Sequence, residues 1–188
     1  MVKTLTPVCA FDTPAIDFRL PDTAGKFWTL EECRGKNGLL VMFICNHCPF
    51  VKSILSDLAT DTEKLKKVGI NTVAIMSNDI EDYTEDSPEH MAQIAQQYHF
   101  SFPYLYDESQ KVAQAYGAVC TPDFFGYNKD LKLQYRGRFD ARQMNKPAPD
   151  SMHELLQAMQ QVAETGKGPV EQTPSIGCSI KWKKNQAE

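Results

Sequence analysis

Runs of apolar residues, separated by polar segments rich in glycine and proline, divide this chain into short alternating elements. Residues 38–44 carry no polar side chain, and residues 70–77 form a second, largely apolar run. Such runs are typical of central strands covered on both faces. Between them apolar residues recur at helical spacing up to Gly69, which predicts a helix after the first strand (Val51, Ile54, Leu55, Leu58 and Leu65). This strand–helix–strand unit predicts two parallel strands joined by a helical crossover.

The flanking segments complete an α/β pattern. A hairpin is predicted near the N-terminus, and a second one around Asn128-Lys129-Asp130. Ser87 and Pro88 are placed to begin a helix, as N-cap and first-turn residue. The predicted ranges are 15–19 and 27–30 for the first hairpin, 88–98, 109–116 and 152–162 for helices, 102–106 for a short strand, and 123–127 and 131–136 for the second hairpin. We therefore expect a mixed central β-sheet flanked by helices.

Composition and charge narrow the function classes. The chain has 188 residues, 42% of them hydrophobic and 23% charged, with a net charge of −4. We expect one domain over residues 1–168 and a C-terminal tail over 169–188 that packs on it. The charge gives no reason to expect nucleic acid or a membrane as partner. The N-terminus lacks the apolar core of a signal peptide, so we expect a cytoplasmic protein whose cysteines are reduced.

A Cys-x-x-Cys follows directly on the first apolar strand. Cys45 and Cys48 stand where that strand gives way to a helix, and two thiols at this spacing can close a short disulfide. The helix start favours the thiolate, which is the reactive form. The alternatives are two buried structural cysteines or half of a metal site, but a zinc site needs a second pair of ligands. We expect a redox centre with Cys45 as the nucleophile, because Cys48 lies one turn inside the helix.

Several other residues are candidates for this centre. His47 could lower the thiol pKa, or it could be a solvent-facing spacer. Thr121-Pro122 leads into the second hairpin, where the proline could be cis or an ordinary trans residue. Arg138 could lie near the thiolate, or it could be a strand-end charge facing water. The tail carries Cys178 in an Ile-Gly-Cys-Ser-Ile segment, which suggests that it packs over Cys45 as a third, resolving thiol, the alternative being a buried anchor.

An acidic segment after the second strand lacks the central glycine and terminal glutamate of an EF-hand, so we expect a solvated loop (Asp79, Glu81, Asp82, Glu85 and Asp86). No metal or other cofactor is expected.

The order of these features resembles the thioredoxin superfamily. The N-terminal hairpin and the segment over residues 102–117 look like its alkyl hydroperoxide reductase and thiol-specific antioxidant branch. More narrowly, Cys-Asn-His-Cys-Pro-Phe-Val, Tyr-Arg-Gly-Arg-Phe-Asp and Gly-Cys-Ser-Ile-Lys-Trp are similar to segments of bacterial peroxiredoxin-like, thioredoxin-family proteins. The resemblance implies a thioredoxin-like fold, with Cys45 attacking and Cys48 resolving. It also implies a cis Pro122, and a Thr121 backbone that binds a peptide.

The chain departs from peroxiredoxins in one respect. Their Pro-x-x-x-Thr-x-x-Cys places a threonine three residues before the peroxidatic thiol. The corresponding residue here is Met42 for Cys45, and Cys45 itself for Cys48. The sequence therefore predicts a thiol-disulfide oxidoreductase acting on protein or low-molecular-weight disulfides and recycled by a cellular thiol reductant. The alternatives are a thiol peroxidase and a non-enzymatic thiol or metal-binding module.

Overall fold

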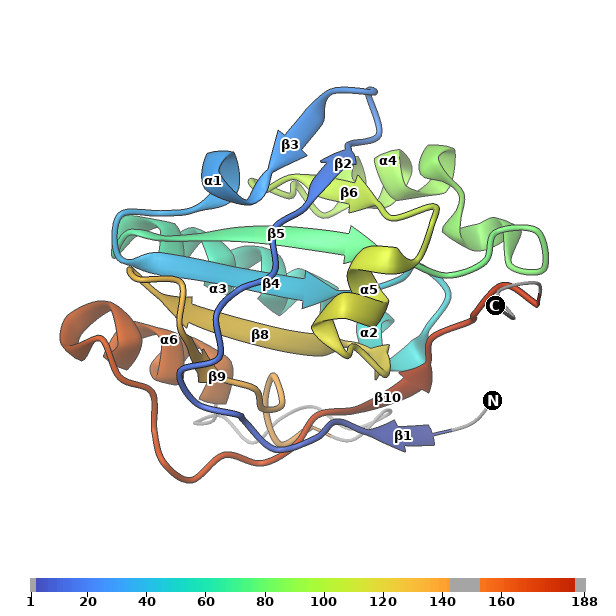
Figure 1. The fold of residues 1–188 in the computed structure, drawn as a ribbon. Coiled ribbons are helices and arrows are strands. Elements are labelled where there is room, and N and C mark those ends of the chain that lie inside the picture. The colour runs from blue at the N-terminus through green and yellow to red at the C-terminus, as the bar shows by residue number, and fades with distance from the viewer. Residues whose placement is uncertain (1–2, 143–152, 185–188) are drawn as a thin grey trace.

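The computed structural model describes residues 3–142 and 153–184. Its centre is a five-stranded mixed sheet (Figure 1), whose strands in spatial order are β6 (Tyr104–Tyr106), β5 (Ile70–Met76), β4 (Gly38–Phe43), β8 (Asp123–Asn128) and β9 (Leu133–Tyr135). The first three run parallel, and β8 and β9 form an antiparallel hairpin beside β4. The predicted architecture is confirmed.

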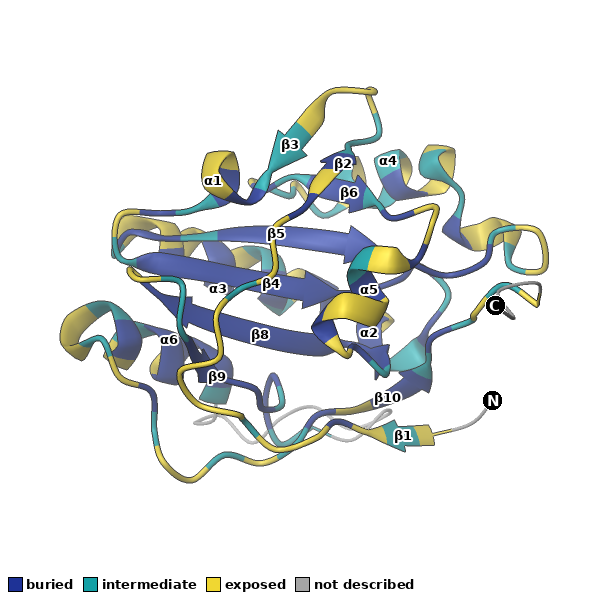
Figure 2. Ribbon diagram, viewed as in Figure 1, coloured by how far each residue is buried: buried dark blue, intermediate teal, exposed yellow. Residues whose placement is uncertain are grey.

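Helices cover both faces of this sheet. One face packs against α2 (Pro49–Lys52), α3 (Leu55–Lys67), α4 (Pro88–Gln97) and α6 (Glu154–Thr165). The other packs against α1 (Leu30–Cys33), α5 (Lys111–Tyr116) and the hairpin of β2 (Arg19–Pro21) and β3 (Phe27–Thr29). Along β4, Leu40 and Met42 enter the first core, whereas alternate residues enter the second. This two-sided covering explains the uninterrupted apolar run, and Figure 2 shows β4, β5 and β8 as buried.

Local differences from the predicted elements have identifiable causes. The helix predicted after Cys48 is two helices, with a break at Ser53 and Ile54. Ser87 caps α4 by accepting a hydrogen bond from the His90 amide, as predicted. The predicted start of the last helix, residue 152, lies outside the described residues. Helix α1 was not predicted, although Thr29 and Glu32 form a capping box at its start.

A second, three-stranded sheet was also not predicted. Strand β10 (Ile176–Ser179) of the C-terminal tail lies between β1 (Lys3–Leu5) and β7 (Cys120–Thr121), antiparallel to both. Strand β7 leads through Pro122 into β8 of the main sheet. Strands β1 and β10, which come from opposite ends of the sequence, therefore pair beside the end of β4 that precedes Cys45 (Figure 1).

Among the described residues, none of the helices combines the length and the apolar character that crossing a bilayer requires.

Candidate active site

The two motif cysteines lie between the end of β4 and the start of α2. Cys45 follows the strand by two residues, and Cys48 is the N-cap residue of α2. Both are buried, with 1% and 0% of their surfaces exposed. Thr121 contacts both: its Oγ1 lies 3.2 Å from the Cys45 sulfur, and its carbonyl oxygen lies 3.1 Å from the Cys48 sulfur. The peptide bond between Thr121 and Pro122 is cis, as the family resemblance implies.

Cys178 is the third thiol of this site. Its sulfur lies 2.9 Å from the Cys48 sulfur, and Cys178 itself is buried. The sequence predicts that the tail packs over Cys45, whereas the Cys178 sulfur contacts that of Cys48. The strand register explains the position, because Cys178 in β10 is paired with Thr121 in β7.

Electrostatics place the negative charge of the motif on Cys48. Hydrogen bonding from the Cys45 thiol lowers the pKa of Cys48 to about 5, although burial acts in the opposite direction, and Cys178 adds a second favourable hydrogen bond. Burial raises the pKa of Cys45, and the neighbouring thiolate raises it further. Because the two thiols titrate as a pair, the reduced motif holds one proton and one negative charge near neutral pH.

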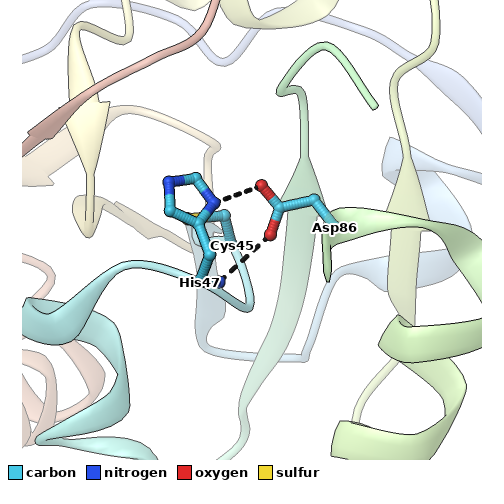
Figure 3. A group of neighbouring side chains, drawn as sticks. All are labelled: Cys45, His47 and Asp86. Atoms are coloured by element: carbon cyan, nitrogen blue, oxygen red, sulfur yellow. Dashed lines mark hydrogen bonds and ion pairs between the residues drawn. The ribbon is translucent and has the colours of Figure 1, made fainter. Parts of the chain in front are cut away.

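A buried carboxylate supports the histidine between the cysteines (Figure 3). The Nδ1 atom of His47 lies 2.6 Å from Oδ2 of Asp86, whose side chain is fully buried. A ring nitrogen of His47, a carboxylate oxygen of Asp86 and the Cys45 sulfur lie within 4.8 Å of one another. The ring of His47 also stacks on Tyr83, with centroids 5.0 Å apart. His47 is therefore not the solvent-facing spacer of the alternative interpretation.

Asp86 corrects the expectation of a solvated acidic loop. Its Oδ1 accepts hydrogen bonds from the backbone amides of Asn46 and His47, at 2.7 and 3.2 Å. Its Oδ2 accepts one from Asn78 at 2.8 Å, besides its contact with His47. Asp79, in the same segment, is also buried, at 7% exposure. Four partners occupy the roughly four acceptor positions of the Asp86 carboxylate, so its hydrogen bonds hold both the loop between the cysteines and the His47 ring.

These contacts fix the loop between the cysteines. The Asn46 side chain donates to the carbonyl of Glu85 at 2.9 Å and accepts from the Tyr104 hydroxyl at 3.0 Å. Together with the two amide bonds to Asp86, they hold the motif against the segment that follows β5. The thiols are thus presented on a rigid loop rather than a mobile one.

The ionisation of Asp86 should be visible in the pH dependence of stability. Burial raises the pKa of Asp86, but hydrogen bonds from the side chains of His47 and Asn78 outweigh it and leave the pKa below its ordinary value of 3.8. The folded state therefore favours the carboxylate. The resulting stabilisation is complete at neutral pH and is lost as the pH falls through 3.8 and below.

We expect Asp86→Asn to lower the free energy of unfolding at pH 7 by about 2–4 kcal/mol, because buried donors lose a charged acceptor. The difference from wild type should shrink between pH 5 and pH 3, measured by urea unfolding. The control is Glu85→Gln, the adjacent exposed carboxylate. A constant difference between Asp86→Asn and wild type over this pH range would contradict the assignment.

The two arginines of the Arg-Gly-Arg segment, Arg136 and Arg138, form ion pairs with carboxylates. Arg138 binds Glu154 through a two-pronged ion pair with contacts of 2.6–3.0 Å. Arg136 is buried and binds Asp123 at 3.0 Å, just after the cis proline. In the part of the chain that the structure describes, both guanidinium groups thus bind carboxylates and not the sulfurs of Cys45 and Cys48. Arg138 therefore pairs with Glu154, and not with the thiolate as the sequence analysis considered.

Arg138 instead lines a groove next to the site. The groove has a volume of about 280 Å³ and runs along Pro122. Its apolar walls come from α2, from the break between α2 and α3, from the two terminal strands and from the segment after β9 (Leu5, Phe50, Ile54, Phe139 and Ile176). Leu5 and Ile176 are cross-strand partners and remain exposed, at 63% and 42%. The cis proline is thus reachable from a partly apolar hollow.

Asp86 is the functional residue that sequence reasoning missed. A topological signal for it exists, because β4 and β5 are adjacent parallel strands and their carboxyl ends meet at one edge of the sheet. Residues after β5 therefore return beside Cys45. The position of Asp86 directly before the Ser87 cap of α4 marks where the chain turns back.

Comparison with known proteins identifies the family. The model of the AhpC/TSA family matches residues 11–136, more than half of the sequence and including both motif cysteines. The chain belongs to the AhpC/TSA family. As a member of this family it is a redox enzyme with a thioredoxin-like fold, and the sequence resemblance is confirmed.

Several solved structures are similar to this chain. An uncharacterized conserved protein from Geobacillus kaustophilus is 41% identical with a TM-score of 0.92, and the match covers 98% of each chain. A hypothetical protein from Sinorhizobium meliloti 1021 is 40% identical with a TM-score of 0.92, covering 97% of this chain and 100% of the other. The thioredoxin domain of a thiol-disulfide oxidoreductase from Bacteroides vulgatus is 14% identical with a TM-score of 0.59, covering 79% and 96%, and it shows the fold alone. No curated protein matches significantly.

Proposed function

We propose that this AhpC/TSA-family enzyme is a thiol-disulfide oxidoreductase that uses Cys45 and Cys48 as its dithiol couple. The observation that carries the proposal is that both sulfurs of the Cys-x-x-Cys motif lie together against Thr121, at 3.2 and 3.1 Å. A thiolate and a thiol in hydrogen-bond contact already have the composition needed for exchange, since one attacks while the other holds the proton. The proton can pass between the two sulfurs, so the resting charge on Cys48 does not prevent attack by Cys45.

The reaction needs no group beyond the substrate. The Cys45 sulfur attacks one sulfur of a substrate disulfide, forms a mixed disulfide and releases the other substrate sulfur as a thiolate, which takes up a proton. Cys48 then attacks the Cys45 sulfur, closes the Cys45–Cys48 disulfide and releases the second substrate thiol. The substrate gains two electrons from the couple, one proton from its single thiol and one proton from solvent. A cellular thiol reductant restores the couple.

In this proposal His47 and Asp86 are positioning residues. A carboxylate can only accept hydrogen bonds, so the His47 nitrogen that faces Asp86 carries a proton. The imidazole ring is thereby held in one orientation next to Cys45. Because the ring lies beside the Cys45 sulfur, it stabilises the negative charge on this sulfur as the mixed disulfide forms and breaks.

The groove along Pro122 supports a polypeptide substrate. Its walls are largely apolar, and Arg138 and Arg142 contribute charged groups to its lining. A disulfide carried by an extended segment could lie in it with apolar side chains against Phe50 and Ile54. The burial of both cysteines requires local movement of the covering residues when such a segment binds.

Paired assays on the reduced protein test the proposal against peroxidase activity. We expect insulin disulfides to be reduced at least about tenfold faster than by dithiothreitol alone, because the motif already carries one negative charge, which passes to Cys45 when its proton moves to Cys48. Consumption of hydrogen peroxide with the same reductant should stay near the uncatalysed rate, since the peroxidatic threonine position is occupied by Met42. Fast peroxide consumption without insulin reduction would instead favour a thiol peroxidase.

A further inference from the structure

The C-terminal strand occupies the edge next to the cis proline. The family resemblance assigns the Thr121 backbone to a bound peptide, yet in this structure Thr121 is paired with Cys178 of β10. Gly177 makes this approach close, because any Cβ at that position would collide with the Thr121 carbonyl. The chain's own tail therefore lies where a substrate strand was expected, with a cysteine directed at the active-site thiol.

The sulfur geometry supports a chemical role for this cysteine. The Cys178 and Cys48 sulfurs lie 2.9 Å apart, and a disulfide requires about 2.05 Å. An approach of about 0.9 Å therefore brings them to bonding distance. Burial raises the pKa of Cys178 to about 12, so in the reduced protein it is a thiol that can share its proton with the Cys48 thiolate.

The tail is fixed at this position from both sides. The Ser175 hydroxyl donates to the Pro122 carbonyl at 2.9 Å. Beyond the strand, the amide of Lys181 donates to Asn78 Oδ1 at 2.9 Å, and the same Asn78 side chain donates to Asp86. The segment that carries Cys178 thus contacts Cys48 and the Asn78 side chain that binds Asp86. Such contacts are expected for a part of the active site rather than an appended tail.

We propose that Cys178 is a third redox thiol, which exchanges with the Cys45–Cys48 disulfide to form a Cys48–Cys178 disulfide. This proposal rests on the proposed function, which supplies the oxidised couple. The Cys178 sulfur attacks the Cys48 sulfur, the Cys45–Cys48 bond breaks, and Cys45 leaves as a thiolate that accepts the proton of Cys178. The reactants and the products of this step each contain one disulfide and one thiol, so no outside oxidant is needed. Cys45 is then free to act again while the oxidising equivalents are held on the tail.

Other cysteines of the described chain do not have this geometry. Cys33 is buried against the opposite face of the sheet. Cys120 lies in the strand next to β10, but its sulfur is directed at the Pro122 carbonyl at 3.7 Å. Cys33 therefore provides a matched control, a buried cysteine outside the site.

Peptide mapping of the oxidised protein tests the proposal. Reduced wild-type protein is treated with oxidised glutathione, quenched with acid, alkylated with N-ethylmaleimide and digested with trypsin. Cys45 and Cys48 fall in one peptide (37–52) and Cys178 in another (168–181). A Cys45–Cys48 bond stays within the first peptide, whereas the proposed bond links the two. We expect the linked pair in wild type and in Cys33→Ser, with fragmentation placing the bond on Cys48, and not in Cys178→Ala.

Three outcomes distinguish the possibilities. Formation of Cys45–Cys48 without linked peptides would overturn the role of Cys178 and leave the proposed function intact. Failure of Cys178→Ala to form the Cys45–Cys48 disulfide would contradict the proposed function. A linked fraction that falls about tenfold when the protein is diluted tenfold would show a bond between molecules, which also overturns the proposal. Cys178→Ala should keep its cooperative thermal transition, so that loss of the link reports on the sulfur and not on unfolding.

Discussion

Cys45→Ser is expected to lower the rate of disulfide reduction by on the order of a thousandfold or more, the loss typical of removing a catalytic nucleophile. A serine hydroxyl remains protonated and does not attack a disulfide. The companion variant Cys45→Ala removes the hydrogen bond that the Cys45 thiol gives to Cys48, the largest influence lowering the Cys48 pKa. The pKa of Cys48, measured by thiolate absorbance, should therefore rise in Cys45→Ala. Insulin reduction gives the rate.

The matched control is Cys33→Ser, which removes a buried thiol in α1, on the opposite face of the sheet. Its activity should equal that of wild type, once the thermal transitions of both variants have been compared. If Cys45→Ser reduced insulin at the wild-type rate, Cys45 could not be the attacking thiol.

Cys48→Ser should stop turnover to a similar degree, on the order of a thousandfold, but at a different step. Cys45 can still attack oxidised glutathione, and no neighbouring thiolate then resolves the product. We expect one glutathione attached to Cys45, detected by mass spectrometry of the intact protein and of its tryptic peptides. Loss of Cys48 also removes the charge that raises the Cys45 pKa, so the first attack should be retained.

The opposite pattern would reverse the roles of the two thiols. A stable adduct on Cys48 in Cys45→Ser, together with an unreactive Cys48→Ser protein, would assign the attack to Cys48. The low pKa of Cys48, about 5, makes this the sharpest competing assignment.

The sequence predicted most of the fold because the main elements bury continuous or periodic apolar surface. Strands β4 and β5 are covered on both faces, so their residues are apolar throughout. Strands β1 and β10 carry no such pattern. They are three and four residues long, and their pairing joins positions near opposite ends of the chain, so local patterning does not specify them.

The candidate site was predictable to the extent that its chemistry is local. The spacing of Cys45 and Cys48 predicts a redox centre, and the family resemblance implies a cis Pro122. Asp86 was not predictable from composition, because its burial is compensated by backbone amides about forty residues earlier in the chain. A carboxylate in an acidic segment is ordinarily solvated, and only the tertiary hydrogen bonds reverse that expectation. The contact of Cys178 with Cys48 likewise depends on the register of β10.

The most direct test of the dithiol couple is a stoichiometric reaction of the fully reduced protein with a peptide disulfide, followed by acid quench and disulfide mapping. We expect two substrate thiols to be released for each protein disulfide formed, and that disulfide should contain Cys48, joined to Cys45 or to Cys178. Release of substrate thiols while Cys45 and Cys48 both remain alkylated as free thiols would contradict it.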